Sequence, residues 1–392
     1  MTALLPLVAC STDTTRETVQ PNNNNMNNAN ADAGVAMTPD SGPPPPQGLP
    51  ILGNGTHSLA EVVLEVVADA SDDLNLPTDL EFHPDRANEL WVTNEGSSQF
   101  WVGTDLGTDF KSVNSIEGRG AHLHFLTKPS GLAFGDQYCG AERCLATSHG
   151  NVNDQPRTTG NAPVDFMGPS LWTSDVTTYR GSGPYHAAHY DMLHNSPDAM
   201  GIAWDKGNAF WLFDGYHRAI AHYDFNSDHG AGGSDHSDGE INRWVQGSVA
   251  KVDGVPSHLE FDSESGLLYI ADTGNKRVAV MDTNSGVQGS SYRNYDTNRP
   301  SYRYDAMITT LVDGGMIGIQ QPSGIALYDG HIYVSDHATG TIYGFKLDGE
   351  LVDYLDTQRG SGTIAGLAFD NDGNLFFADK SNEQIVKISL KP

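Results

Sequence analysis

The chain has 392 residues and is strongly acidic, with 22 Lys and Arg residues against 50 Asp and Glu residues and a formal net charge of -28. This charge repels a phosphate backbone, so nucleic acid is excluded as the partner. Beyond the leader, no apolar run is long enough to cross a bilayer as a helix. We therefore expect a monomeric protein that touches a membrane only through its N-terminus.

The leader ends in Leu7-Val8-Ala9-Cys10, which resembles the lipobox of bacterial lipoproteins. The resemblance implies that residues 1–10 form the signal segment and that Cys10 carries a lipid anchor. It also implies residence in the bacterial cell envelope, as an outer-membrane or periplasmic lipoprotein. Because the leader lacks Lys and Arg and has a short apolar core, an ordinary export leader and a secreted protein are the alternative.

Residues 11–56 contain four consecutive Asn residues (22–25) and four consecutive Pro residues (43–46), with very few large apolar side chains. Such a segment cannot bury enough apolar surface to offset the entropy of ordering. We predict a disordered tether that holds the domain of residues 57–392 away from a surface.

One pattern recurs six times in the domain: an apolar strand that begins with Pro or a small residue, a turn, and a second apolar strand that ends in most copies with Asp or Asn. Alternation of large and small residues around a tight turn predicts β-hairpins. The hairpins pair residues 77–82 with 90–94, 129–134 with 145–148, 200–204 with 210–214, 256–261 with 268–272, 322–327 with 332–336, and 365–369 with 375–379.

Two phrases, Tyr269-Ile270-Ala271-Asp272 and Tyr333-Val334-Ser335-Asp336, resemble NHL repeats. The resemblance implies an all-β fold, a six-bladed β-propeller of four-stranded antiparallel blades. The last copy lacks room for a fourth strand, so we expect residues 59–67 to supply it and close the ring. Small residues on the first strands let the six strands crowd around one axis. These residues include Gly131, Gly201, Gly324 and Gly366.

Cys139 and Cys144 flank a turn-like segment around Gly140, which predicts a local disulfide. With Cys10 lipidated, no free thiol would be left, as an oxidising compartment favours. The alternative is a pair of unpaired surface thiols in a cytosolic protein.

The starts of the first strands and the ends of the second strands lie side by side in antiparallel blades, so we expect their polar residues to converge on one face. The segment 185–194 should overhang the same rim. These polar residues are Asp79, Asn94, His149, Asp214, Tyr216, His217, His258, Asp272, Asp336, His337 and Asp379. For the aspartates at the ends of the second strands, such as Asp272, Asp336 and Asp379, we expect the carboxylates to cap turn amides. Four histidines, His149, His217, His258 and His337, are candidate ligands for zinc or another transition metal, with hydrogen-bonded histidines as the alternative.

Three segments resemble the peptidylglycine amidating lyase: Phe213-Asp214-Gly215-Tyr216, Val255-Pro256-Ser257-His258-Leu259 and residues 332–337. The resemblance implies Tyr216 as the catalytic tyrosine and His258 as a zinc ligand. The family's Pro-His-Ser order is Pro256-Ser257-His258 here, a shift that turns the side chain to the other face of the strand. The next expected histidine is replaced by Ser323-Gly324.

A loop between the third and fourth strands of the third blade carries acidic residues beside glycines, on the opposite face. Oxygen ligands at this density suit calcium, with a solvated acidic loop as the alternative. The candidate ligands are Asp228, Asp235, Asp238 and Glu240. The insertion 291–304, rich in Tyr and Arg, should lie on that face, either contacting a partner or packing on its own blade.

No G-x-S-x-G elbow, P-loop or dinucleotide fingerprint is present in the sequence. Function therefore depends on analogy of fold. The first hypothesis is an exported, lipid-anchored binding module for a protein, peptide or glycan ligand. The alternative is a metal-dependent lyase or lactonase-type hydrolase with a His and Tyr site on the propeller face.

Overall fold

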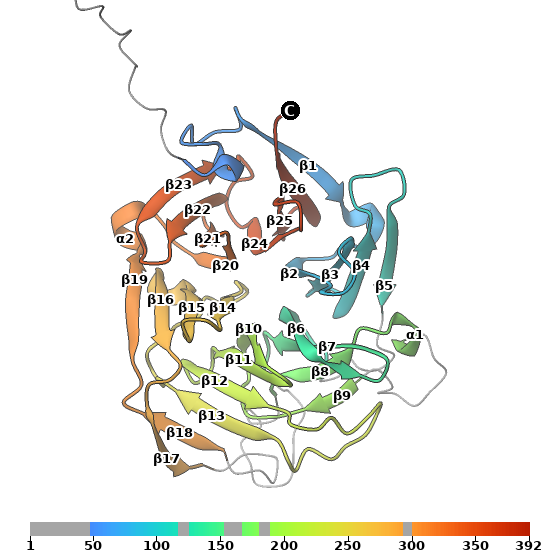
Figure 1. The fold of residues 1–392 in the computed structure, drawn as a ribbon, viewed down its shortest axis with the longest axis vertical. Helices are drawn as coiled ribbons and strands as arrows, with labels where there is room; N and C mark the ends of the chain where they lie inside the picture. The colour runs from blue at the N-terminus through green and yellow to red at the C-terminus, as the bar shows by residue number, and fades with distance from the viewer. Residues whose placement is uncertain (1–47, 117–124, 153–166, 180–188, 293–299) are drawn as a thin grey trace, which may run out of the picture. The chain divides into compact units, whose positions relative to one another are not determined.

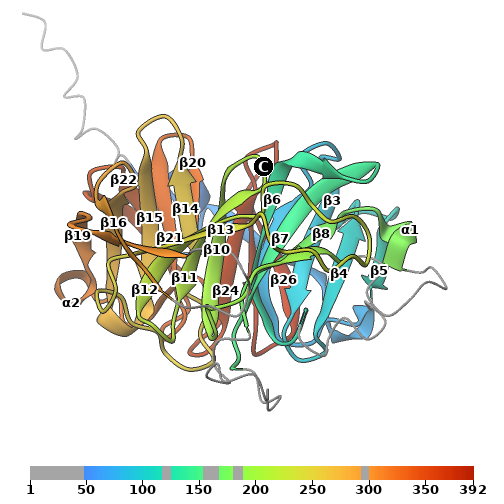
Figure 2. The same cartoon turned by 90° about the horizontal axis from the view of Figure 1, so that it is seen from below.

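The computed structural model describes residues 48–116, 125–152, 167–179, 189–292 and 300–392. They form six sheets arranged as blades around a central axis, each with four antiparallel blade strands, and Figure 1 views this ring down the axis. The predicted six-bladed β-propeller is therefore confirmed. Figure 2 shows the same blades from the side, with their strands running from one face of the ring to the other.

Blades one to three follow the chain from residue 77 to residue 244. Their strands are β2 (Pro77–Phe82), β3 (Glu89–Asn94), β4 (Gln99–Thr104) and β5 (Ser112–Ile116) in blade one, β6 (Pro129–Cys139), β7 (Glu142–His149), β8 (Ser170–Thr173) and β9 (His189–Met192) in blade two, and β10 (Ala199–Lys206), β11 (Ala209–Asp214), β12 (Ala219–Asp224) and β13 (Glu240–Trp244) in blade three.

Blades four to six continue to the C-terminus. Their strands are β14 (Leu259–Asp262), β15 (Leu267–Asp272), β16 (Arg277–Asp282) and β19 (Ile308–Asp313) in blade four, β20 (Pro322–Tyr328), β21 (His331–Asp336), β22 (Thr341–Lys346) and β23 (Leu351–Asp356) in blade five, and β24 (Ile364–Phe369), β25 (Leu375–Asp379), β26 (Gln384–Leu390) and β1 (Val62–Ala68) in blade six. The described helices are short: η1 (Pro50–Leu52), η2 (Ala70–Asp72), α1 (Val176–Tyr179), η5 (Thr273–Asn275) and α2 (Gly314–Ile317). In the described ranges, none is long and apolar enough to span a membrane.

The N-terminal strand β1 closes the ring, as predicted. It pairs antiparallel with β26, with Val62 opposite Leu390 and Val66 opposite Val386. The first and last strands thus lie side by side at the outer edge of blade six (Figure 1). This pairing joins the two ends of the domain and covers an edge that would otherwise be free to aggregate.

Residues 48–56, which the sequence analysis assigned to the tether, are folded against the propeller. Leu49, Ile51 and Leu52 around η1 are buried against blades five and six. The backbone amides of Leu49 and Gly55 donate to Asp353 Oδ2 at 2.9 and 2.8 Å. A short apolar run after the prolines is enough to dock because a buried carboxylate satisfies its amides.

The apolar core consists of six clusters, each between two neighbouring blades. Between blades one and two, for example, Trp91, Phe100 and Trp172 are fully buried, and the rings of Phe100 and Trp172 meet edge to face at 5.6 Å. Each blade therefore buries both faces of its sheet, which explains why most second strands are uniformly buried rather than alternating.

The innermost strands approach each other as closely as the glycines allow. A Cβ atom on Gly324 would lie 2.0 Å from the backbone oxygen of Ala365 in the next blade. A Cβ atom on Gly201 would lie 2.2 Å from the oxygen of Ser257. These glycines are needed for contact between blades, as the sequence analysis expected.

Blade three has two additional strands, β17 (Val287–Ser291) and β18 (Ser301–Tyr304), contributed by the insertion between the strands of blade four. β18 pairs parallel with β13, with Arg243 opposite Tyr302, and β17 pairs antiparallel with β18. The insertion was expected on the face opposite the rim, packed on its own blade or contacting a partner. It instead extends the outer edge of blade three (Figure 1), while residues 293–299 lie outside the described residues.

Cys139 and Cys144 form the predicted disulfide. It links β6 and β7 next to the pair Tyr138 and Arg143, and both sulfur atoms belong to buried residues. Cys10 lies outside the described residues, so the lipid anchor stays a prediction.

Substitution Gly324→Ala should lower the free energy of unfolding by about 1–3 kcal/mol, or prevent folding, because the new methyl group must displace the Ala365 carbonyl. The control is Gly315→Ala in α2, where the nearest atom is the flexible Asp313 carboxylate at 3.2 Å. Urea unfolding of both variants measures the difference. Equal stability of the two variants would contradict the crowding argument.

Candidate functional site

The aspartates at the ends of the second strands cap turns, as their capping interpretation predicts. Asp272 accepts from the Ala250 amide and from Asn275 and Arg277, each at 2.8 Å. Asp336 accepts from two backbone amides of the preceding loop, those of Gln320 and Gln321. These buried carboxylates bind the loops on one face of the ring. We call this face, where the second strands end, the rim face.

Three of the four candidate histidine ligands lie within hydrogen-bonding distance of an oxygen of their own or the next blade, and the fourth, His258, contacts other blades. His149 Nδ1 lies 2.9 Å from the Gly168 oxygen, His217 Nδ1 lies 2.8 Å from Asp214 Oδ2, and His337 Nδ1 lies 3.0 Å from the Ile364 oxygen. Burial lowers the pKa of His149 to about 4 and lowers the pKa of His337. Among the described residues, none of the four belongs to a group of three potential ligands with ligand atoms within 4.8 Å of one another.

Tyr216, the predicted catalytic tyrosine, lies in the turn between β11 and β12 and is 46% exposed. Its ring meets that of His217 edge to face at 5.0 Å. His217 is in turn bound to Asp214, so the structure brings the tyrosine and one candidate histidine together on the rim face.

His258 lies at the propeller axis. Its Nδ1 is 3.3 Å from Asp79 Oδ1 of the opposite blade, and its Nε2 is 2.9 Å from the Ser130 oxygen of blade two. Asp79 Oδ2 also accepts from the Leu132 amide at 2.9 Å. The Ser130 carbonyl can only accept, so it accepts from the Nε2–H of His258. This pair therefore links three blades across the channel.

Two further carboxylates, Glu81 and Glu260, were missed by the sequence analysis. They follow Asp79 and His258 by two residues on β2 and β14, the innermost strands of opposite blades. Burial raises the pKa of Glu260 to about 8, with Asp79 adding to the shift. Burial, reinforced by Glu260 and then Asp79, raises the pKa of Glu81 well above its usual value. We call Asp79, Glu81, His258 and Glu260 the channel cluster.

An alignment of the six repeats would have revealed the channel cluster. Four repeats place Gly and Ala two residues apart on the first strand, as in Gly131-Leu132-Ala133 and Gly366-Leu367-Ala368. The other two repeats place Asp79-Leu80-Glu81 and His258-Leu259-Glu260 at the same positions. Large polar side chains from two opposite blades thus fill the space that the four small pairs leave.

The acidic loop between β12 and β13 binds its own backbone. Asp228 accepts from the Gly230 amide, Asp235 from the Ser237 amide and Asp238 from the Ser227 amide. Glu240 is exposed at the start of β13. These four predicted calcium ligands do not form a group of convergent ligands among the described residues. The one group found there consists of Asp191, His229 and His236.

The segment 185–194 was expected to overhang the rim. Residues 180–188 lie outside the described residues, and His189–Met192 form β9, the outer strand of blade two. Trp172 pairs with His189 and Ser170 with Met192, so β9 starts near the opposite face and runs toward the rim. The described part is therefore a blade strand rather than a rim loop.

A polar groove of about 610 Å³ lies between blades three and four; we call it the inter-blade groove. Trp211 and Trp244 line it, 4% and 6% exposed, with their rings 4.9 Å apart. In the part of the chain that the structure describes, neither indole N–H has a hydrogen-bond partner. The other lining residues include Asp205, His222, Asp224, Glu240, Asn242, Phe261 and Arg303.

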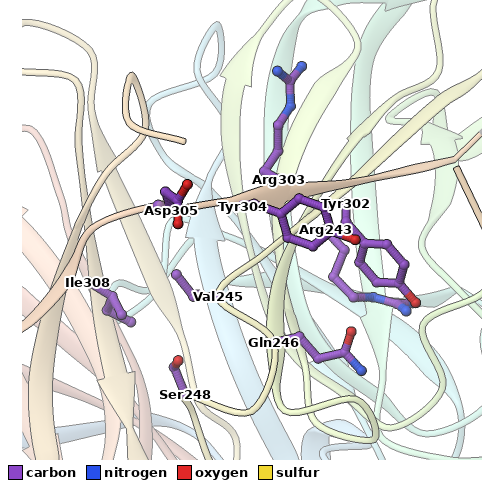
Figure 3. A pocket seen from close by; sticks show the side chains of 10 residues that line it. Arg243, Val245, Gln246, Ser248, Tyr302, Arg303, Tyr304, Asp305 and Ile308 are labelled. Atoms are coloured by element: carbon purple, nitrogen blue, oxygen red, sulfur yellow. The ribbon is translucent and has the colours of Figure 1, made fainter. Parts of the chain in front are cut away.

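A second cavity of about 390 Å³ lies beside β18 (Figure 3). Tyr302 and Arg243 extend to one side of this strand, and Arg303 extends to the other. Arg303 lines both the cavity and the inter-blade groove, and its guanidinium carbon lies 5.4 Å from the Trp244 ring centroid. The additional hairpin of blade three therefore forms a wall shared by the two hollows.

A scan against protein-family models and a search of curated proteins found no match. Among solved structures, the chain is similar to an auxiliary nutrient binding protein from Bacteroides thetaiotaomicron, with 11% identity over 85% of this chain and 77% of that chain and a TM-score of 0.51. A protein of unknown function from the same organism has 12% identity over 84% and 76% and a TM-score of 0.50. At these identities, both similarities establish the propeller fold alone. A streptogramin B lyase has 12% identity over 84% and 98% and a TM-score of 0.48.

The raised pKa of Glu260 predicts that thermal stability falls as pH rises. A carboxyl group with a folded-state pKa of about 8 stabilises the fold fully below its unfolded pKa of about 4.3 and loses that contribution as pH rises through 8. The melting temperature should therefore fall between pH 5 and pH 8.5, with a smaller fall in Glu260→Gln. The matched control is Glu264→Gln, an exposed residue on the same blade, which should keep the wild-type slope.

Proposed function

We propose that this protein is an exported binding module that holds a neutral glycan in the inter-blade groove. The observation that carries the proposal is a pair of tryptophans that line the groove, Trp211 and Trp244, whose buried indole N–H groups have no hydrogen-bond partner among the described residues. Buried donors are nearly always paired, so such groups favour a ligand rich in acceptors.

The chemistry of the groove favours a glycan over a peptide or protein surface. Its volume of about 610 Å³ lies within the range of small-ligand sites. Sugar hydroxyls both donate and accept, and the lining offers carboxylate acceptors beside amide and guanidinium donors. Asp205 is already bound to His222 at 2.9 Å, which leaves Glu240, Asn242 and Arg303 as the groups best placed to bind hydroxyls.

Charge selects the class of glycan. Four carboxylates line the groove, on Asp205, Asp224, Glu240 and Glu264, against the two cations Lys206 and Arg303. The chain as a whole carries a formal net charge of -28. An anionic polysaccharide would be repelled on approach, so the proposed ligand is uncharged.

Export and anchoring complete the proposal. The disulfide between Cys139 and Cys144 supports an oxidising compartment outside the cytosol. Lipidation of Cys10 would tether the propeller to the cell envelope, and the NHL-like repeats would supply its blades. The similarity in fold to an auxiliary nutrient binding protein is in keeping with a role in nutrient capture.

A second candidate function is a lyase or lactonase-type hydrolase, favoured by the channel cluster. A carboxyl group such as Glu260, protonated at neutral pH, can act as a general acid, and opposed carboxylates with raised pKa values are frequent in active sites. In this candidate function, Tyr216 would act as the catalytic tyrosine and His258 as a ligand of a bound zinc ion. Turnover of a lactone panel by the wild type, lost in Glu260→Gln, would support it.

Isothermal titration with neutral oligosaccharides of glucose, xylose, mannose and galactose tests the glycan proposal. We expect at least one series to bind, and Arg303→Ala and Glu240→Ala each to weaken binding about tenfold or more. The reason is that a charge-assisted hydrogen bond contributes roughly 1.5–3 kcal/mol.

Glu350→Ala, an exposed carboxylate on blade five, is the matched control and should bind as the wild type does. Polygalacturonate and heparin should not bind. The proposal fails if no neutral series binds, or if binding survives both groove substitutions unchanged.

A further inference from the structure

A histidine-rich cluster lies where the loop between β12 and β13 packs on the outer strand of blade two. Asp191 belongs to β9, and His229 and His236 belong to the loop. The ligand atoms of these three residues lie within 4.8 Å of one another. The three side chains come from two blades, so the tertiary fold and not a local motif brings them together.

The backbone fixes the loop on β9. The His229 amide donates to the Tyr190 oxygen at 3.1 Å, and the Gly232 amide donates to the His189 oxygen at 2.9 Å. A Cβ atom on Gly233 would lie 2.7 Å from His229 Nδ1, so a glycine at this position leaves room for the ring. The position of His229 beside Asp191 is thus set by main-chain contacts that do not depend on a ligand.

The protonation of His229 suits a metal ligand. Its Nδ1 lies 2.7 Å from the Gly230 oxygen, which can only accept, so the proton is on Nδ1. The lone pair of the neutral ring is then on Nε2, and this atom is buried without a hydrogen-bond partner among the described residues. A fixed Nδ1–H with a free Nε2 is the arrangement that metal-ligating histidines adopt.

Asp191 supplies a second unpaired atom. The residue is fully buried, and its Oδ2 has no hydrogen-bond partner in the described part of the chain. Its Oδ1 lies 2.7 Å from His236 Nδ1 and accepts from the Met192 amide at 2.6 Å. A buried carboxylate oxygen without a partner is costly, and a cation would compensate it.

Further imidazole rings surround the cluster. The ring centroid of His189 lies 4.7 Å from that of His229, and the centroid of His194 lies 6.0 Å from that of His236. His189 and His194 are both buried. Their nitrogen-rich surroundings differ from the oxygen ligands that calcium requires.

From this geometry we infer a transition-metal site in which Asp191, His229 and His236 bind zinc or a similar divalent ion and clamp blade three to blade two. Imidazole and carboxylate ligands together suit zinc, and three protein ligands leave a fourth position for water or a neighbouring ring. The clamp is separate from the channel cluster and from His149, His217 and His337.

Zinc binding to the full chain tests the inference. The protein carries Cys10→Ser throughout, to remove the only cysteine outside the disulfide, and is freed of metal with EDTA. Titration against a chromogenic zinc chelator should give one zinc per chain, and His229→Gln and His236→Gln should each weaken binding at least tenfold. Cobalt(II) should give a visible absorption spectrum of a nitrogen- and oxygen-ligated ion that both variants lose.

His331→Gln is the matched control, because that ring binds its own turn on blade five and should leave zinc binding unchanged. Zinc should raise the melting temperature of the wild type and of this control but not of the two cluster variants. Each protein is compared with and without zinc, so the test remains valid if a variant is less stable than the wild type. A chain that binds no zinc, a stoichiometric site that survives both cluster substitutions, or displacement of zinc by equimolar calcium would each overturn the inference.

Discussion

The close approach of six innermost strands to one axis is the constraint on which the rest of the molecule depends. Four blades satisfy this constraint with a Gly and an Ala on the first strand. The other two, which lie opposite each other, carry Asp79 with Glu81 and His258 with Glu260. A Cβ atom on Gly366 would lie 2.6 Å from Asp79 Oδ1, so small residues on some blades and polar residues on others are complementary. The bridge from Asp79 to His258 then joins opposite blades, and burial beside Asp79 raises the pKa of Glu260.

Departures from six-fold repetition concentrate around blade three. This blade receives the hairpin β17–β18 from the chain of blade four, and its β12–β13 loop packs on blade two. The hairpin provides Arg303 to the inter-blade groove, and the loop provides His229 and His236 to the cluster with Asp191. Both proposed ligand sites therefore include segments that cross from one blade to another. These segments are insertions outside the repeated strands, so the repeat does not restrict which side chains they carry.

The sequence pattern correctly predicted the features that depend on interactions between residues close together in the chain. Hairpin alternation gave the six blades and the need for a closing strand, and the spacing of Cys139 and Cys144 gave the disulfide. The same approach assigned Asp272 and Asp336 to capping, because a carboxylate at a turn is bound by amides close in the chain. It did not identify Glu81 and Glu260, since only a comparison of all six repeats distinguishes their polar strands from the small-residue ones.

By itself, the sequence determined the propeller, its closure by β1 and the covalent link between β6 and β7, because each depends on periodicity or on neighbours in the chain. Only the tertiary structure decided that Asp79 meets His258 across the axis, that the insertion joins blade three, and that Asp191 lies beside His229 and His236. The physical reason is that these contacts join residues of different blades. Their distances depend on how the sheets are arranged around the ring, which no local pattern encodes.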